Sequence, residues 1–155
     1  MRKKIAFGAV LLLLALAVPA QVSAQCGTEP GQICANVNLS GQNLSGANLQ
    51  GSIFTGANLS GANLSNANLT GVIFEGSNLS GATLAGATLA GAQFDAATSL
   101  NGANASNSQA PGAILSGDLT NSNWTSANLQ GAILAGANLS GATLSGANET
   151  GCICQ

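Results

Sequence analysis

The chain has 155 residues, of which 46% are hydrophobic and only 5% are charged, and its formal net charge is −2. It contains no histidine and no tyrosine, and its three basic residues are Arg2, Lys3 and Lys4. So few cations exclude a nucleic-acid partner held by counterion release, and a serine or cysteine nucleophile would lack the neighbouring base that it needs.

Residues 1–24 are typical of a secretory signal peptide. A basic start, MRKK, precedes an apolar run of about fourteen residues and a small-residue cleavage site that ends at Ala24. The run is shorter than the roughly 20 residues of a membrane span. We therefore predict that the mature chain begins at Gln25, is secreted or periplasmic, and has no membrane contact after cleavage. A lipid anchor on Cys26 is the alternative, although lipoprotein processing usually requires Gly, Ala or Ser before the cysteine.

Removal of this leader leaves a chain without Lys, Arg or His. It keeps five acids and therefore a formal charge of about −5; these acids are Glu29, Glu75, Asp95, Asp118 and Glu149. A hydrolase built on paired carboxylates would have only these candidates, and none is close to another in sequence. We predict that the protein is not an enzyme and has neither a cofactor nor a metal site.

A five-residue repeat fills the chain from Val37 to Gly151. Most units read ANLSG or a variant with leucine at the centre, and phenylalanine takes that place at Phe54, Phe74 and Phe94, twenty residues apart. A short period sustained over this length is typical of a solenoid, whose units bury their apolar faces only by stacking. A period of five fits an extended piece followed by a turn. The centre and the small residue two before it then point inward, and the neighbours of the centre face water.

These A-N-L-S-G units resemble the pentapeptide-repeat family, whose consensus is A-(D/N)-L-x-x. The resemblance covers residues 37–151 and implies an all-β fold, a right-handed quadrilateral β-helix with four units in each coil. About six coils would make a rod on the order of 28 Å long. Since twenty residues complete one coil, Phe54, Phe74, Phe94 and, further along, Leu134 should form one inward core ladder.

The four cysteines lie at the two ends of the mature chain, in a cap at 25–36 and a tail at 152–155. An exported protein favours disulfides, and a rod of this length separates the two ends by more than the roughly 7 Å that a disulfide can bridge. We expect one bond to close the cap, and the tail cysteines to bond to each other or to another molecule. These pairs are Cys26 with Cys34 and Cys152 with Cys154.

The repeat is irregular over 95–118. Two centres come one residue late before Leu119 restores the frame, so an insertion and a deletion cancel. Alanine replaces leucine at two further centres, and Pro111 should remove a donor from the ladder of backbone hydrogen bonds. We interpret 95–112 as a bulged or loosely packed coil, and a functional loop is the alternative.

A candidate interaction stripe precedes the core ladder, at Ile53, Ile73 and Ile133. These side chains should point outward, and a vertical stripe of exposed apolar residues suits docking by a second rod or another protein. Alternatively, isoleucine merely favours the extended backbone. On the same side Glu75 and Asp95 should lie one coil apart. They could share a divalent cation, but we interpret them as a solvated pair.

Other outward positions form columns of asparagine, such as Asn38, Asn58, Asn78 and Asn138, which could hydrogen-bond along the rod. Trp124 falls on a centre, so we interpret it as core filler rather than as a binding aromatic.

These features favour an exported, non-catalytic scaffold that acts as a protein-interaction or structural module, with another protein or a second copy as its partner. An ice- or surface-binding solenoid is the alternative, but Thr83, Thr88 and Thr143 are too scattered to form regular columns. A DNA mimic that acts on a DNA-binding enzyme, which the resemblance implies for some members, is less favoured because the outward positions hold asparagine rather than aspartate.

Overall fold

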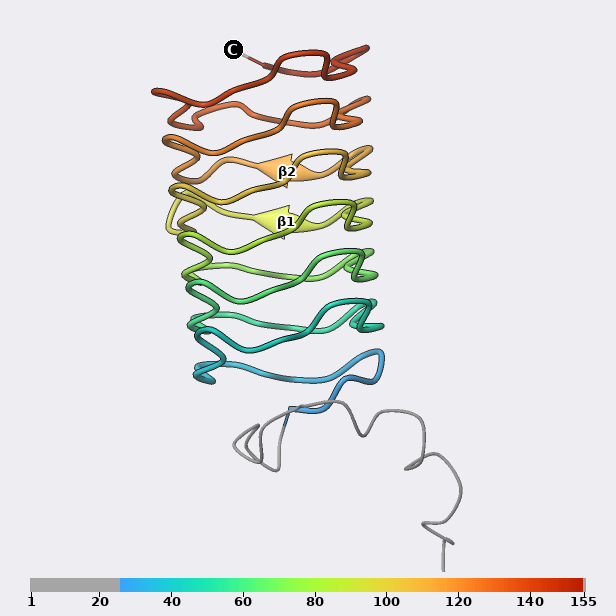
Figure 1. Ribbon diagram of the computed structural model, residues 1–155, viewed down its shortest axis with the longest axis vertical. Coiled ribbons are helices and arrows are strands. Elements are labelled where there is room, and N and C mark those ends of the chain that lie inside the picture. The colour runs from blue at the N-terminus through green and yellow to red at the C-terminus, as the bar shows by residue number, and fades with distance from the viewer. Residues whose placement is uncertain (1–25, 155) are drawn as a thin grey trace, which may run out of the picture.

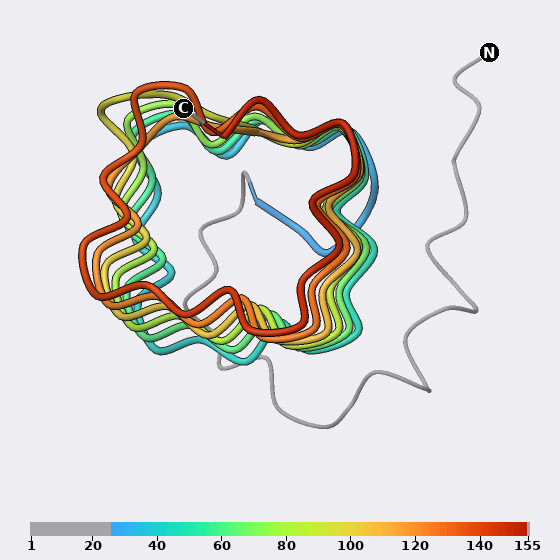
Figure 2. The ribbon, with the colours of Figure 1, turned by 90° about the horizontal axis from the view of Figure 1, so that it is seen from above.

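The computed structural model describes residues 26–154, which wind into a rod of stacked coils (Figure 1). Seen along the rod, each coil is a ring with four sides and four corners (Figure 2), and each side is one five-residue unit. The architecture is therefore a parallel β-helix of quadrilateral cross-section. The predicted signal peptide at 1–24 lies outside the described residues.

Regular strands are short. Strand β1 (Gln93–Phe94) pairs in parallel with strand β2 (Ile114–Leu115), in the register Gln93↔Ile114 and Phe94↔Leu115. Elsewhere one residue of each unit makes an isolated parallel bridge to the next coil, as Asn38 does to Asn58. No helix long and apolar enough to cross a membrane occurs between positions 26 and 154.

Backbone hydrogen bonds join each coil to the next. The N–H of Leu39 donates to the carbonyl of Asn58 at 2.7 Å, and the N–H of Asn58 donates to the carbonyl of Val37 at 2.8 Å. The corner residue has a positive φ, +65° at Gly41 and +58° at Asn66. Glycine and asparagine accept this conformation most readily, which explains why they close the units.

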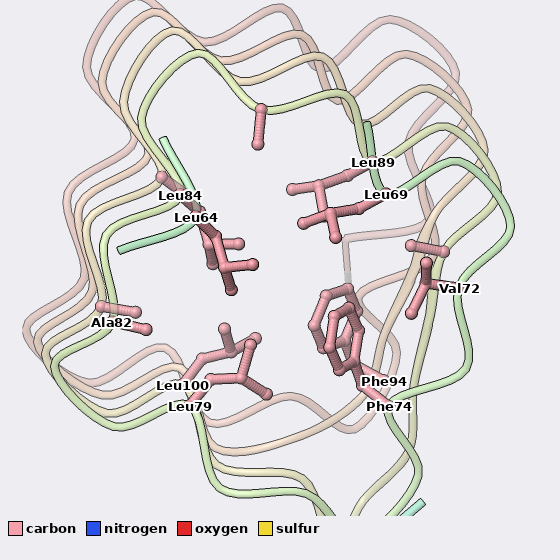
Figure 3. Packing of buried hydrophobic residues seen from close by; sticks show 14 of the residues in the cluster. Leu64, Leu69, Val72, Phe74, Leu79, Ala82, Leu84, Leu89, Phe94 and Leu100 are labelled. Atoms are coloured by element: carbon pink, nitrogen blue, oxygen red, sulfur yellow. The ribbon is translucent and has the colours of Figure 1, made fainter. Parts of the chain in front are cut away.

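The predicted core ladder lies inside the rod. Phe54, Phe74 and Phe94 are fully buried, and their rings stack with centroid distances of 5.5 and 4.9 Å. Leu134 continues the same column and is only 3% exposed. Figure 3 shows the rings of Phe74 and Phe94 stacked beside Leu69 in the interior. The twenty-residue rhythm therefore corresponds to one coil.

Ala105 and Trp124 occupy successive levels of another inward column. Both are fully buried, and their units are bridged at Asn104↔Asn123. The indole N–H of Trp124 donates to Oγ of Ser122 at 2.9 Å. The small alanine leaves room for the large indole one level on, so the interior stays filled. Trp124 is core filler, as the sequence indicated.

Residues 95–112 form a packed coil with a bulge at one corner. Leu100, Ala105 and Ala110 are fully buried, and Leu100 donates its N–H to the carbonyl of Asp118 at 2.7 Å. The bulge was expected, but the expectation of loose packing is wrong. The inserted residue is absorbed in a single corner, so the rest of the coil keeps its hydrogen bonds to both neighbours.

The deletion that follows requires a glycine. The corner before Leu119 is one residue shorter, and it passes close to the lengthened corner below. A Cβ at the buried Gly117 would overlap the backbone carbonyl oxygens of Thr98 and Asp95. Glycine therefore allows the two irregular corners to stack.

Pro111 removes no ladder hydrogen bond, contrary to the expectation from the sequence. It stands directly after a centre, where the N–H usually donates to the side chain two residues earlier, as Ser60 does to Oδ1 of Asn58 at 3.1 Å. Two positions before Pro111 stands Gln109 instead of that capping asparagine. The carbonyl of Pro111 still accepts from the N–H of Gly91 at 3.0 Å, so proline fits here without loss.

The predicted Cys26–Cys34 disulfide is present, and of the two possibilities for the tail cysteines the structure has the local bond Cys152–Cys154; the Cα–Cα distances are 5.1 and 5.4 Å. The two disulfides lie at opposite ends of the core ladder. Cys34 is one level from Phe54, because Ile33 bridges Ile53, and Cys154 is one level from Leu134, because Ile133 bridges Ile153.

These bridges correct the boundaries of the cap and the tail. Residues 32–34, assigned to a cap at 25–36, form the first bridged side of the rod, and 152–154, assigned to a tail, form the last. Of the cap, only the residues that precede 32–34 leave the ring, and they cross the opening of the first coil (Figure 2). The cysteine spacing hid these units because cysteine replaces leucine at both centres.

Replacing Phe74 by alanine should lower the free energy of unfolding by about 3–5 kcal/mol, since the stacked rings on both sides cannot collapse into the gap. Thr55→Ala, an exposed change, should stay within about 0.5 kcal/mol. Denaturant unfolding followed by circular dichroism measures both. Near-native stability of the Phe74 variant would contradict the buried column.

Ala105→Leu should cost about 1–3 kcal/mol, because the added carbons meet the indole of Trp124. In the double variant Ala105→Leu with Trp124→Leu, leucine returns to both levels, and the cost should be at least about 1 kcal/mol less than the sum of the two single changes. Additive costs in this double-mutant cycle would show that the two residues do not share space.

Candidate interaction face

The residue before each centre points outward, and on three sides of the rod it is polar in every coil. These columns are Asn38, Asn58, Asn78, Ser99, Asp118 and Asn138; Asn43, Asn63, Thr83, Asn104, Asn123 and Thr143; and Asn48, Asn68, Thr88, Gln109, Asn128 and Asn148. The three threonines are divided between two of these sides. No regular threonine array runs along the part of the rod that the structure describes.

Asparagine side chains hydrogen-bond along two of these sides. Nδ2 of Asn63 donates to Oδ1 of Asn43 at 3.3 Å, and Nδ2 of Asn68 donates to Oδ1 of Asn48 at 3.0 Å. The column of Asn38, Asn58, Asn78 and Asn138 was expected to form such a ladder, but its asparagines make no amide-to-amide bond within residues 26–154. They accept the backbone N–H two residues later and cap their own turn, as Asn58 does, and asparagines of the other two columns cap their turns in the same way.

The fourth side carries isoleucine at six of its seven outward positions. We call this column the isoleucine stripe; it consists of Ile33, Ile53, Ile73, Gln93, Ile114, Ile133 and Ile153, each bridged to the next. Every isoleucine between residues 26 and 154 lies in it. The stripe therefore runs the full height of the rod.

Three isoleucines of the stripe were missed by sequence reasoning, and they are its most exposed isoleucines. Ile33 is 68% exposed, Ile153 is 56% exposed and Ile114 is 37% exposed, whereas the predicted Ile53, Ile73 and Ile133 are half-buried. The first two stand at the twenty-residue period but in units whose centres are cysteine. Ile114 stands 21 residues after Gln93, so the insertion hides it.

Strand propensity does not explain this distribution. All four sides have the same bridged backbone, so a preference of isoleucine for extended structure would place it on every side. The stripe instead follows one side through both frame shifts. The preference for an extended backbone therefore does not account for the column by itself.

Two carboxylates flank the stripe. Glu75 is exposed, but Asp95 accepts a hydrogen bond at Oδ1 from the N–H of Gly76 at 2.8 Å and another from Oγ1 of Thr98 at 2.7 Å. The bond from Gly76, followed by that from Thr98, holds the pKa of the Asp95 carboxyl below its ordinary value of 3.8. Asp95 therefore caps a corner of the preceding coil, and the solvated-pair interpretation fits only Glu75.

Metal binding finds no support in this geometry. Among residues 26–154 no group of three or more His, Cys, Asp or Glu side chains is placed to hold an ion. Calcium prefers six or more oxygen ligands, and two flanking carboxylates cannot supply them.

A cavity of about 230 Å³ lies under the cap at the N-terminal end of the rod. Its lining includes Leu39, Leu44, Leu49 and Phe54 together with the cap residues. It is the interior of the first coil that the cap leaves unfilled. A ligand site needs polar groups that converge on the ligand, and this lining is predominantly apolar.

The sequence matches a known family model, described as pentapeptide repeats. The match comprises eight copies, over residues 33–71, 62–98, 77–117 and 118–148. No curated protein matches the chain.

Solved structures of pentapeptide repeat proteins are similar to this chain. HetL of the cyanobacterium Nostoc, involved in heterocyst differentiation regulation, is 32% identical with a TM-score of 0.52; the alignment covers 79% of this chain and 59% of HetL. Rfr23 of the cyanobacterium Cyanothece is 27% identical with a TM-score of 0.42, over 81% and 90% of the two chains. A thylakoid-lumen protein of Arabidopsis thaliana is 26% identical with a TM-score of 0.37, over 66% and 63%. The chain thus spans less than two thirds of the length of HetL.

Asp95→Asn should lower stability at pH 7 by about 0.5–1 kcal/mol, because a charged acceptor is lost and solvent screens part of its contribution. Since the folded pKa lies below 3.8, this stabilisation is present above that pH and disappears as the pH falls through the folded value. Urea unfolding at pH 7 and at pH 2 to 3 measures the difference. Glu75→Gln is the matched control and should change little, while an equal deficit of the Asp95 variant at both pH values would contradict the cap.

Proposed function

The chain belongs to the pentapeptide-repeat family, and we propose that it is an exported, non-catalytic scaffold whose isoleucine stripe docks a protein partner, either another protein or a second copy of the chain. One observation carries this proposal: every isoleucine of residues 26–154 lies in a single outward column, while the other three columns are polar. An apolar surface rimmed by polar groups is typical of a protein-interaction site.

The rod in this proposal is right-handed and has about six coils. The coil count rests on the stripe, which has seven bridged levels between Ile33 and Ile153. Export rests on the leader-like residues 1–24 and on the two disulfides, since such bonds persist mainly in oxidising compartments.

Chemistry argues for binding rather than catalysis. Residues 26–154 contain no Lys, Arg or His, so the many hydroxyl groups on the surface have no neighbouring base to activate them. Asp95, whose carboxyl pKa is lowered by hydrogen bonds from Gly76 and Thr98, is occupied as a cap. What the surface offers for binding is the apolar area of the isoleucine stripe on the stacked coils.

The stripe can supply a useful part of a binding free energy. Fully burying an isoleucine gains roughly 1.5–3 kcal/mol, and the stripe members are already partly covered. A gain on the order of 1 kcal/mol for each of six residues must still offset the loss of rotational and translational freedom on association. A specific but reversible complex is the expected outcome.

Co-purification from the exported fraction tests the proposal. The chain is produced with its leader, and Ile53→Ser, Ile73→Ser and Ile133→Ser are combined in one variant. The matched control combines Asn58→Ser, Asn78→Ser and Asn138→Ser, which alter the neighbouring side at the same three levels. We expect the wild type and the asparagine variant to retain the same partner in mass spectrometry, whether another protein or a co-expressed second copy that carries a different tag, and the isoleucine variant to lose it.

Thermal unfolding of all three proteins controls for folding, and the intact mass reports whether cleavage follows Ala24. Retention of the partner by a folded isoleucine variant would overturn docking through the stripe. A chain that is not exported would overturn the assigned compartment.

A further inference from the structure

We propose that the occupant of the isoleucine stripe is a second copy of this chain, packed with the two stripes face to face and the two rods parallel. This inference rests on the proposed use of the stripe as a docking surface. It adds the identity of the partner and its orientation.

The spacing of the stripe fits a second stripe. Successive coils of a β-helix lie about 4.8 Å apart, so the outward side chains of two copies come at the same intervals along the rod. Each isoleucine of one copy then meets an isoleucine of the other at every level but one. A flat apolar surface without this period would leave gaps between levels.

The exceptional level is Gln93, the fourth of seven. It is exposed, with Ile73 one level below it and Ile114 one level above. An apolar partner would bury this amide without a hydrogen bond, which is costly. In a symmetric pair Gln93 meets Gln93 of the second copy, and because each amide has both a donor and an acceptor group, the two can bond reciprocally.

The flanking acids decide between the two orientations. Glu75 and Asp95 both follow their centres, so they lie on one flank of the stripe. If the two-fold axis runs along the rods, the acidic flanks of the two copies lie on opposite sides of the interface. If the axis runs across the rods, the rods are antiparallel and both acidic flanks lie on the same side of the interface, where Asp95 of one copy faces Asp95 of the other. With no Lys, Arg or His in residues 26–154 to neutralise that pair, repulsion disfavours the crossed axis.

The size of the face predicts a weak dimer. The rod is roughly 30 Å high, and the extended part of one side, about three of its five residues, is about 10 Å wide, so each copy would cover on the order of 300 Å². Both faces together stay below the roughly 1,200 Å² of standard interfaces, in the size range of weak and transient contacts. Association should therefore be reversible, with a Kd in the micromolar range.

Sedimentation equilibrium of the exported, disulfide-bonded protein tests the dimer. We expect a monomer at concentrations near 1 μM and a dimer above about 100 μM. The combined Ile53, Ile73 and Ile133 to serine variant should stay monomeric, and the matched asparagine variant should behave as the wild type. A wild type that remains monomeric at 1 mM, or a folded isoleucine variant that still dimerises, overturns the inference.

Gln93→Glu provides a test that leaves the core untouched. It is nearly isosteric, and it places two carboxylates against each other at the central level. We expect at least a tenfold weaker dimer at pH 7 and recovery toward the wild-type Kd near pH 4. An unchanged Kd at pH 7 overturns the pairing at Gln93.

Cross-linking distinguishes the two orientations. All four native cysteines are paired in disulfides, so an introduced cysteine is the free thiol. Parallel rods place position 73 opposite itself, whereas antiparallel rods place it opposite position 114. Ile73→Cys alone should give a cross-linked dimer with a short bismaleimide, and cross-linking only after mixing with Ile114→Cys overturns the parallel arrangement. If the wild type does not dimerise, the second copy is excluded as the occupant. The co-purification then tests independently whether a different protein binds the stripe.

Discussion

The rod depends on the register of its backbone ladder. Each centre donates its N–H to the coil that follows, and each preceding residue donates to the coil before, so every donor must stand level with an acceptor about twenty residues away. This constraint makes the position of a residue on one of the four sides a direct consequence of its number. Burial, capping and the isoleucine stripe all follow from that relation.

The same constraint explains how the rod absorbs an irregularity. An inserted residue would turn every later unit away from its side, so a deletion one coil later is needed to restore the ladder. The two irregular corners stack because Gly117 has no side chain to collide with the carbonyl of Thr98. In the same region Ala105 yields space to Trp124. The register of the repeat and the volume of the core are therefore both restored within two coils.

The residues available for contacts outside the rod are those at its outward positions. Three sides use those positions for asparagine caps and amide ladders, which serve the rod itself. Isoleucine has no polar side-chain atoms, so its side chains make no such hydrogen bonds. The backbone bridges of the isoleucine side are the same as those of the other three sides. The stripe, and not the predominantly apolar cavity under the cap, is therefore the candidate site on which the docking proposal rests.

The sequence alone determined the repeat, the inward phenylalanine column and three of the six isoleucines of the stripe, because each follows from a local period of five and a turn of twenty. It also indicated the Cys26–Cys34 pair, because a rod of this length keeps its two ends apart. The tertiary structure decided what the period could not. Ile33, Ile114 and Ile153 join the stripe because bridges across coils carry the register through cysteine-centred units and through the bulge. Asp95 likewise took its role as a cap from Gly76, nineteen residues earlier, and such a contact exists only when the coils are stacked.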